Sequence, residues 1–308
     1  MSNRPDQHLR SDDEPIAYLQ RVRSYYEALG YGAPYEWAHF DDVPFAPLRK
    51  PLSACTVALV TTAAPYNADA GEQGPGAPYN AAAKFYAVYS VPTDSDPDLR
   101  IAHLAIDREH TRADDPATWL PIAALRDAAA AGRIGTLGPR IHGLPTNRSR
   151  RATLEVDAPE LLARCRADAV DAAILVANCP VCHQSTSIAA RTLEAGGIAT
   201  VVMGCALDIV ERVGVPRFVF SDFPLGNAAG RPHDPASQTA TLALALDVLE
   251  AATAPRTTLR SPLRWSKDDA WKLDYCNVER LAPAEIARRR AEFDAGKVVA
   301  QGLREAIR

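Results

Sequence analysis

Residues 171–184 have the sequence DAAILVANCPVCHQ, in which an apolar run is followed at once by a Cys-x-x-Cys element. The short aliphatic run is typical of a buried strand in a parallel sheet. A helix is expected to begin near Ser185, so Cys179 and Cys182 lie at a strand-to-helix junction. Free backbone N–H groups and the positive dipole end of a helix favour a thiolate there. The stretch therefore predicts an α/β fold with a sulfur nucleophile at the end of one strand.

Short strands and helices alternate through most of the chain. Strands are expected at residues 56–62, 99–107, 171–177, 198–203 and 217–221. Helices are expected at residues 15–29, 122–131, 158–168, 185–195, 206–213 and 235–251, and from Pro283 onward. This alternation indicates an α/β protein with mainly parallel sheets flanked by helices, arranged as two lobes with a C-terminal wrapping tail.

The alternation is most regular after residue 153, and it places a domain boundary near residues 147–151. We expect residues 1–150 to form an N-terminal α/β lobe, in which the aromatic and proline-rich residues 31–52 form a wrapping arm. Residues 151–255 form the C-terminal lobe that carries the Cys-x-x-Cys element. Residues 256–308 form a tail that ends in a charged helix.

The composition describes an ordinary globular chain of 308 residues with 47% hydrophobic residues and a formal charge of −4. The slight acidic balance argues against nucleic acid as a partner. Apolar runs are far shorter than the roughly 20 residues that cross a bilayer, so no membrane segment is expected. The polar N-terminus has no apolar signal region, and six cysteines are too sparse for a disulfide framework. The sequence therefore predicts a cytoplasmic protein with reduced thiols.

Ligands of open α/β sheets lie outside the carboxyl ends of the strands, where this chain places several polar residues. Thr61 and Thr62 end the first strand, and Asn178 ends the third. Strand ends also carry such residues simply because turns require them, and for Thr61 and Thr62 that interpretation stays open. The expected substrate-binding residues are Thr61, Thr62, Asn178, Asp222, Gly226, Asn227, Arg231 and His233.

The loop at residues 226–234 has glycines that permit close backbone approach to a ligand. Its N–H groups, with Asn227, Arg231 and His233, are expected to hold a substrate carboxylate. An ordinary glycine turn with a solvent-facing arginine is the alternative. The chain lacks the GxGxxG and GxxxxGK spacings, so neither a dinucleotide cofactor nor ATP is expected.

His183 completes the sequence Cys-x-x-Cys-His, which also marks c-type haem attachment. Haem is rejected because attachment needs export and a buried junction leaves no room for it. A metal ion held by Cys179, Cys182, His183 and Cys205 is the alternative to free thiols, although structural zinc sites have two paired ligand clusters. Without a metal, His183 is expected to serve either as a thiolate partner and proton donor or as a helix cap.

Several segments in a fixed order resemble the selenoprotein B family of glycine, sarcosine, betaine and D-proline reductases. Members of that family have a U-x-x-C element before a helix, an E-x-A-G-I-P-x-V strand entry and a P-L-G loop. The similar segments here are the Cys179–Cys182 element, EAGGIAT at 194–200 and FPLGN at 223–227. Upstream, LPIAALR at 120–126, AGRIG at 131–135 and PR at 139–140 resemble further family segments, so the resemblance spans about residues 50–235.

The resemblance implies that Cys179 is the attacking chalcogen and that Cys182 is its redox partner. In the family the selenolate displaces an amine from the α-carbon of a substrate, which is often activated by a pyruvoyl group on a partner subunit. This chain has cysteine at the selenocysteine position, and a thiolate is less acidic and a poorer nucleophile at carbon. We expect Cys182 to resolve the adduct as a disulfide, which an external thiol system such as a thioredoxin-like protein reduces.

Two other classes of function remain as alternatives. Cofactor-independent amino-acid racemases need one thiol from each lobe, but the first strand of this chain ends in Thr61-Thr62. A subunit that carries metal or sulfur within a larger complex is the non-enzymatic alternative. The tail aromatics Trp265, Trp271 and Tyr275 are expected either to cover the same chain or to clamp a second copy. His103, His110 and His142 are expected near strand or loop ends, and residues 110–115 are expected either to approach the cleft or to form a solvated loop.

Overall fold

The computed structural model describes residues 14–306 apart from residues 32, 76–79, 81, 102, 104 and 147–148. The described helices are α1 (Tyr18–Ala28), α2 (Ile122–Ala130), α3 (Arg150–Ala152), α4 (Ala158–Ala167), α5 (Pro180–Ala195), α6 (Leu207–Val213), α7 (Pro235–Ala251) and α8 (Pro283–Ala306). The described strands are β1 (Thr56–Thr61), β2 (Ala64–Pro65), β3 (Tyr89–Pro92), β4 (Leu99–Arg100), β5 (Thr136–Leu137), β6 (Arg140–Gly143), β7 (Ala172–Val176), β8 (Ala199–Gly204), β9 (Arg217–Phe220) and β10 (Thr257–Arg260).

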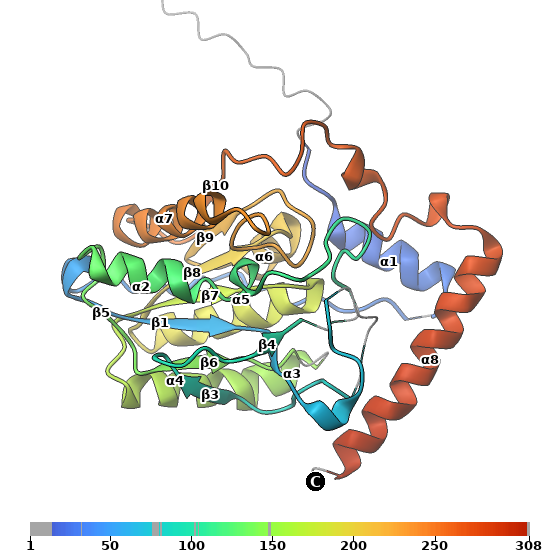
Figure 1. Ribbon diagram of the computed structural model, residues 1–308, viewed down its shortest axis with the longest axis horizontal. Coiled ribbons are helices and arrows are strands. Elements are labelled where there is room, and N and C mark those ends of the chain that lie inside the picture. Colours follow the sequence, from blue (N-terminus) through green and yellow to red (C-terminus); the bar gives the residue numbers. More distant parts are fainter. Residues whose placement is uncertain are drawn as a thin grey trace, which may run out of the picture.

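A central sheet has the strand order β10-β9-β8-β7-β1-β6-β3, and β5 pairs with β1. All of its pairs are parallel except that between β3 and β6. The α/β class with a mainly parallel sheet flanked by helices is confirmed (Figure 1). Strands from both predicted lobes share this sheet, because Val57 of β1 lies opposite Ala172 of β7. The division near residue 150 stays a prediction.

The two faces of the sheet pack against different helices, since successive side chains of a strand point to opposite faces. Val57 and Leu59 belong to the core beneath α2 and α7. Ala58 and Val60 belong to the core beneath α4, α5 and α6. The helices therefore sandwich the sheet, and the carboxyl ends of its parallel strands open at one shared edge.

The N-terminal arm, which was expected to wrap around the chain, lies along α5. The N–H of Ala38 donates to Gln184 Oε1 at 2.7 Å, and Arg191 Nη1 donates to the carbonyl of Asp42 at 2.7 Å. Further along, Glu194 and Arg217 form an ion pair at 2.8 Å with both side chains fully buried. The bonds of Ala38 and Asp42 satisfy arm backbone groups that packing removes from water. With the arm in place, α5 is buried on almost every side.

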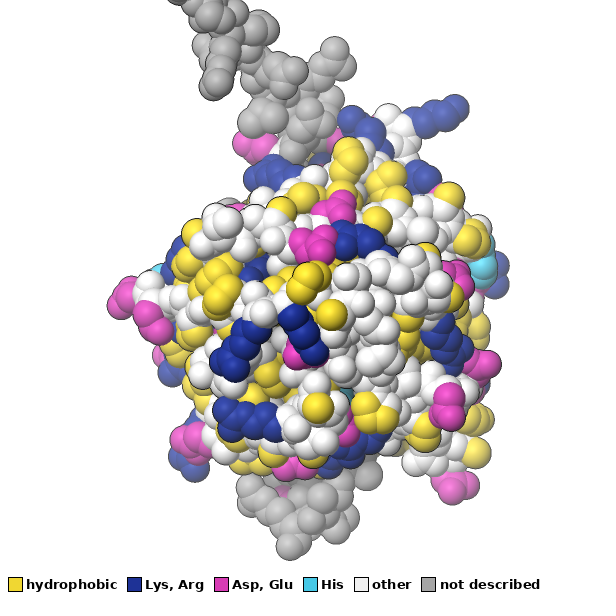
Figure 2. All heavy atoms as spheres, turned by 90° about the vertical axis from the view of Figure 1, so that its left-hand side faces the viewer, with side chains coloured by type: hydrophobic (Ala, Val, Ile, Leu, Met, Phe, Trp, Pro, Cys, Tyr) yellow, Lys and Arg dark blue, Asp and Glu magenta, His cyan; other side chains and the backbone are white. Residues whose placement is uncertain are grey.

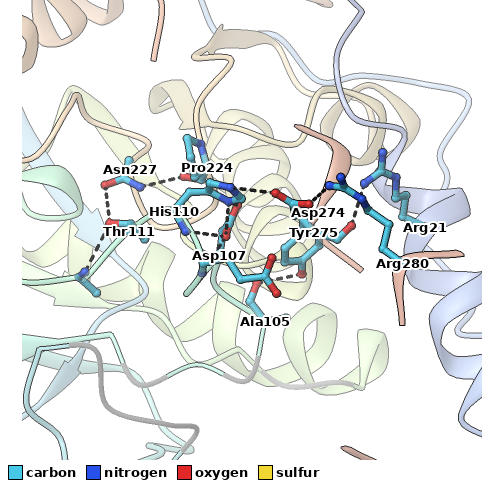
Figure 3. A network of polar contacts seen from close by, with 12 residues as sticks. Arg21, Ala105, Asp107, His110, Thr111, Pro224, Asn227, Asp274, Tyr275 and Arg280 are labelled. Atoms are coloured by element: carbon cyan, nitrogen blue, oxygen red, sulfur yellow. Dashed lines mark hydrogen bonds and ion pairs between the residues drawn. The ribbon is translucent and has the colours of Figure 1, made fainter. Parts of the chain in front are cut away.

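The C-terminal tail covers its own chain. Trp271 and Tyr275 are buried in the main core, and Tyr275 donates its hydroxyl to the carbonyl of Ala105 at 3.0 Å. Figure 3 shows how Asp274 meets His110, which itself bonds to Asp107. Helix α8 then runs beside α1 along the right of Figure 1. Of the two roles expected for these aromatics, the structure shows intramolecular cover.

The strand expected at 99–107 is wrong beyond its first two residues. Among the described residues of this range only Leu99–Arg100 is a strand, and it pairs with β2 outside the central sheet. Asp107 instead turns its carboxylate to the N–H groups of Glu109 and His110, which closes a polar turn. Strands β3, β6 and β10 were not expected, because each has four residues and no long apolar run.

Among the described residues no helix is long and apolar enough to cross a membrane. On the face shown in Figure 2, Lys and Arg side chains lie among Asp and Glu side chains without a large region of one sign. This mixture agrees with the small formal charge of −4.

Candidate functional site

Cys179 and Cys182 lie together where β7 ends and α5 begins. Helix α5 starts at Pro180 rather than near Ser185, because Cys179 itself is the N-cap and proline is favoured at the first helical position. The Cys179 sulfur accepts the N–H of Cys182 at 3.2 Å. The two sulfurs are at disulfide distance, and their Cα atoms are 4.9 Å apart. Cys179 keeps 6% of its surface exposed whereas Cys182 keeps none, so Cys179 is the more accessible thiol.

His183 is fully buried in the first turn of α5, and both of its ring nitrogens bond to backbone. Nδ1 donates to the carbonyl of Cys179 at 2.8 Å, and Nε2 accepts the N–H of Cys205 at 2.8 Å. Burial lowers the pKa of His183 to about 4, so the ring is neutral at pH 7. In this arrangement neither nitrogen is left for a thiol or a metal ion, and the ring ties the ends of β7 and β8 together.

Asn178 and Thr62 form a polar pair directly beside the cysteines. Asn178 Nδ2 donates to Thr62 Oγ1 at 2.9 Å. Asn178 Oδ1 is buried and has no hydrogen-bond partner among the described residues, which is costly unless a ligand or water fills that place. Thr61 instead donates its hydroxyl to the carbonyl of Trp119 at 2.9 Å. Thr62 and Asn178 therefore line the site, and Thr61 supports the strand end.

His103 is the residue that sequence reasoning missed. One of its ring nitrogens and the sulfurs of Cys179 and Cys182 lie within 4.8 Å of one another. Its Nδ1 is buried and has no hydrogen-bond partner among the described residues. Burial, together with the charges of Lys84 and Arg108, lowers the pKa of His103 to about 3. The sequence placed His103 in a strand expected at 99–107, whereas the structure places its ring beside the two sulfurs that follow β7.

The loop after β9 carries the expected substrate-binding residues Asp222, Gly226 and Asn227. Asn227 Nδ2 donates to the carbonyl of Pro224 at 3.0 Å, and Thr111 donates to Asn227 Oδ1 at 3.3 Å (Figure 3). Gly226 has φ +111, and its missing side chain leaves room for Ile101. Asp222 forms an ion pair of 2.6 Å with a tail lysine, Lys272. These residues hold the loop and the tail in place, and their side chains have protein partners.

Arg231 and His233 lie on the outer side of the same loop. Arg231 pairs with Asp234 at 2.7 Å, and His233 pairs with Asp114 at 3.0 Å. The His233 side chain is 67% exposed. These contacts match the alternative of an ordinary glycine turn with a solvent-facing arginine, and no contact of the described residues links either side chain to Cys179.

Cys205 follows β8, and its thiol is buried as well. Burial raises the pKa of Cys205, which keeps the thiol protonated. The cluster of possible ligands found at this edge is His103, Cys179 and Cys182, without Cys205 or His183. Two pockets of about 480 and 500 Å³ lie elsewhere, one between α1 and α8 and one beside α4, and neither includes Cys179.

Comparison with known proteins finds three similar curated chains. The D-proline reductase subunit gamma of Acetoanaerobium sticklandii is 30% identical over 198 residues, which cover 64% of this chain and 78% of that subunit. The glycine reductase complex component B subunit gamma of Carboxydothermus hydrogenoformans is 30% identical over 198 residues, covering 62% of this chain and 44% of the relative. The subunit of that name from Symbiobacterium thermophilum is 28% identical over 236 residues, which cover 73% of this chain and 52% of that subunit.

No family model matches the chain, and no solved structure matches it. The chain spans about half the length of the two glycine reductase subunits but more than three quarters of the D-proline reductase subunit. The identity and coverage of that last match agree with the ordered segments that carried the resemblance. The chain belongs to the selenoprotein B family of glycine, sarcosine, betaine and D-proline reductases.

Proposed function

We propose that this chain is the thiol-bearing subunit of a reductase complex that cleaves a carbon–nitrogen bond in a small amino-acid-like substrate. The observation that carries the proposal is the Cys179–Cys182 pair at the start of α5. Two vicinal thiols supply the two electrons that such a cleavage consumes. The names of the relatives, subunits of D-proline and glycine reductases, favour an amino acid as the substrate class.

The reaction begins with the Cys179 thiolate, which attacks the carbon that bears the amine. A sulfur–carbon bond forms, the carbon–nitrogen bond breaks, and the amine leaves after taking up a proton. The Cys182 thiolate then attacks the Cys179 sulfur, so that a disulfide forms and the sulfur–carbon bond breaks. The released carbon keeps the electron pair and takes up a proton. The substrate is reduced by two electrons, and the two thiols are oxidised.

The assignment of the attacking thiol to Cys179 rests on exposure and on charge. Cys179 keeps 6% of its surface exposed, while Cys182 keeps none and lies behind it. The N–H of Cys182 points at the Cys179 sulfur at 3.2 Å, which stabilises negative charge there. The free oxygen of Asn178 can accept a hydrogen bond from the ammonium group of a substrate.

The proposal also needs partners. An external dithiol, such as a thioredoxin-like protein, must reduce the disulfide after each turnover. A cysteine thiolate is a weaker nucleophile than a selenolate, so we propose that another subunit activates the amine as an imine. The relatives are themselves subunits of complexes, which favours this arrangement. Arg231 and His233 are left out of the proposed carboxylate site, because acidic residues already pair with them.

The decisive experiment measures amine release or ring opening with glycine, sarcosine, betaine and D-proline as substrates. The full chain is supplied with its co-encoded subunits and dithiothreitol. Cys179→Ser should abolish turnover, and Cys182→Ser should stop it after a single round and leave a covalent adduct that mass spectrometry detects on Cys179. Cys165→Ala removes a buried thiol from α4 and serves as the matched control. Full activity of Cys179→Ser would refute the assignment.

A further inference from the structure

The structure points to a proton-exchanging partner for the cysteine pair that lies on a different segment of the chain. We propose that His103 accepts the thiol proton of Cys179 when the thiolate forms and returns it when the thiol is restored. This inference rests on the proposed thiol chemistry of Cys179 but on no particular substrate. It transfers to His103 the role that the sequence had suggested for His183.

Geometry is the first support. A ring nitrogen of His103 and both sulfurs lie within 4.8 Å of one another, so one water molecule or a small ring rotation completes a hydrogen bond. No other described histidine joins the cluster that contains the two sulfurs. His183, although adjacent in sequence, is excluded because backbone groups occupy both of its nitrogens.

The unused hydrogen-bonding capacity of His103 is the second support. Its Nδ1 is buried and lacks a partner among the described residues, and such an atom costs free energy, a cost that functional sites commonly retain. The backbone of Thr62 lies within hydrogen-bonding reach of the ring and favours a proton on the ring. With that proton on Nε2, the lone pair at Nδ1 is the acceptor. Formation of the thiolate then breaks the S–H bond of Cys179 and forms an N–H bond at Nδ1.

The charges around His103 fit a thiolate better than a metal cation. Lys84 and Arg108 are the charged groups that act on the ring, and both lower the pKa of His103. That pKa of about 3 applies to the disulfide, in which neither sulfur carries charge. Reduction places a negative charge beside the ring, which compensates the two cations and raises the affinity of His103 for a proton. Proton uptake by the histidine and thiolate formation are therefore coupled.

The test uses the full chain without substrate. Cys182→Ser leaves Cys179 unable to form the disulfide, and its alkylation by iodoacetamide is followed by peptide mass spectrometry as a function of pH. Adding His103→Gln should raise the apparent pKa of the Cys179 thiol by about one unit and slow alkylation at pH 7 about tenfold. Adding His233→Gln, which changes an exposed histidine paired with Asp114, should leave the profile unchanged. Superimposable profiles for all three proteins would overturn the proposal.

A second measurement needs no histidine variant. The ring protons of His103 are titrated by NMR in the disulfide form and in the reduced form. The pKa of His103 should rise on reduction, and the rise should vanish in Cys179→Ser. An unchanged titration would also overturn the proposal. Neither experiment requires turnover, so both can be interpreted even if the chain shows no reductase activity with any amino acid. In that case the proposed function fails while the proposed role of His103 is still tested separately.

Discussion

His183 Nδ1 lies 2.8 Å from the carbonyl oxygen of Cys179, and the opposite side of the same ring accepts the N–H of Cys205 at 2.8 Å. One buried imidazole thus joins the segments that follow β7 and β8. The bond from His183 ends on the backbone of Cys179 and does not reach the sulfur. The histidine therefore fixes the position of the Cys179 sulfur and does not set the protonation state of the thiol. The position of the Cys179 sulfur therefore depends on there being room for the His183 ring.

Gly204→Ala should displace that ring. A Cβ at residue 204 would lie 2.6 Å from His183 Cδ2 and 2.7 Å from Nε2, too close for either atom to stay in place. Loss of the bonds to Cys205 and Ala206 should lower the free energy of unfolding by about 2 kcal/mol, measured by urea titration. Gly302→Ala is the control, since nothing lies within 4 Å of its added carbon. Equal stability of the two variants would contradict the role of His183.

The free energy of unfolding should fall as the pH drops from about 6.5 to about 4. His183 has a pKa of about 4 in the folded chain, so in this window the unfolded chain binds a proton that the folded chain does not. The contribution lost is about 3 kcal/mol, and no further loss follows below the folded pKa. His142, with a pKa also lowered to about 4, and His103, with a pKa lowered to about 3, add to the slope.

Urea titrations across this range should therefore show a shallower dependence for His183→Gln than for the natural chain, because one of the three histidines with a lowered pKa no longer titrates. An identical slope would show that His183 is protonated in the folded state.

Glu194 and Arg217 should show strong coupling in a double-mutant cycle. Both side chains are fully buried and lie 2.8 Å apart, so Glu194→Leu or Arg217→Met alone leaves one buried charge uncompensated. Each single variant should lose about 3–5 kcal/mol, and the double variant should regain much of that loss. The exposed pair Arg151 and Glu155 provides the control cycle, with a coupling below about 1 kcal/mol. Additive effects at Glu194 and Arg217 would contradict the argument.

His110→Gln should loosen the tail. His110 contacts Asp107 and Asp274 at 3.1 Å each from the two sides of its ring, and a glutamine amide, with donors on a single nitrogen, should not reach both carboxylates (Figure 3). We expect amide hydrogen exchange near Tyr275 to accelerate severalfold, since loss of about 1 kcal/mol corresponds to that change. His39→Gln, at an exposed position in the arm, is the control. Unchanged exchange would mean that the buried Trp271 and Tyr275 hold the tail by themselves.

Local patterns predicted those elements whose signals lie within a few residues. Helix α7 was predicted at both ends, because Asp234 caps it, Pro235 starts it and its apolar run is long. The position of Cys179 at the end of a buried strand followed from the same reasoning. Helix α5 begins earlier than predicted, since Cys179 serves as a cap although cysteine is not a usual one.

Features set by contacts distant in sequence could not be predicted in this way. Strand β6 has four residues, including Arg140 and His142, and exists because β1 offers it a parallel edge. The ring of His103 lies beside the sulfurs of Cys179 and Cys182, which are more than 70 positions away in the sequence, and no spacing in the sequence records that contact. The sequence pattern placed His103 inside a strand expected at 99–107, so it gave no signal of a place beside the cysteines.

The position of β1 between β6 and β7 has a consequence for synthesis on the ribosome. Both neighbours of this early strand emerge long after it, and the arm before it bonds to Gln184 and Glu194, which emerge later still. The arm must therefore wait, without these hydrogen-bonding partners, until the cysteine pair and α5 have been made. The thiols and the strands that frame them become ordered in one late event rather than in sequence.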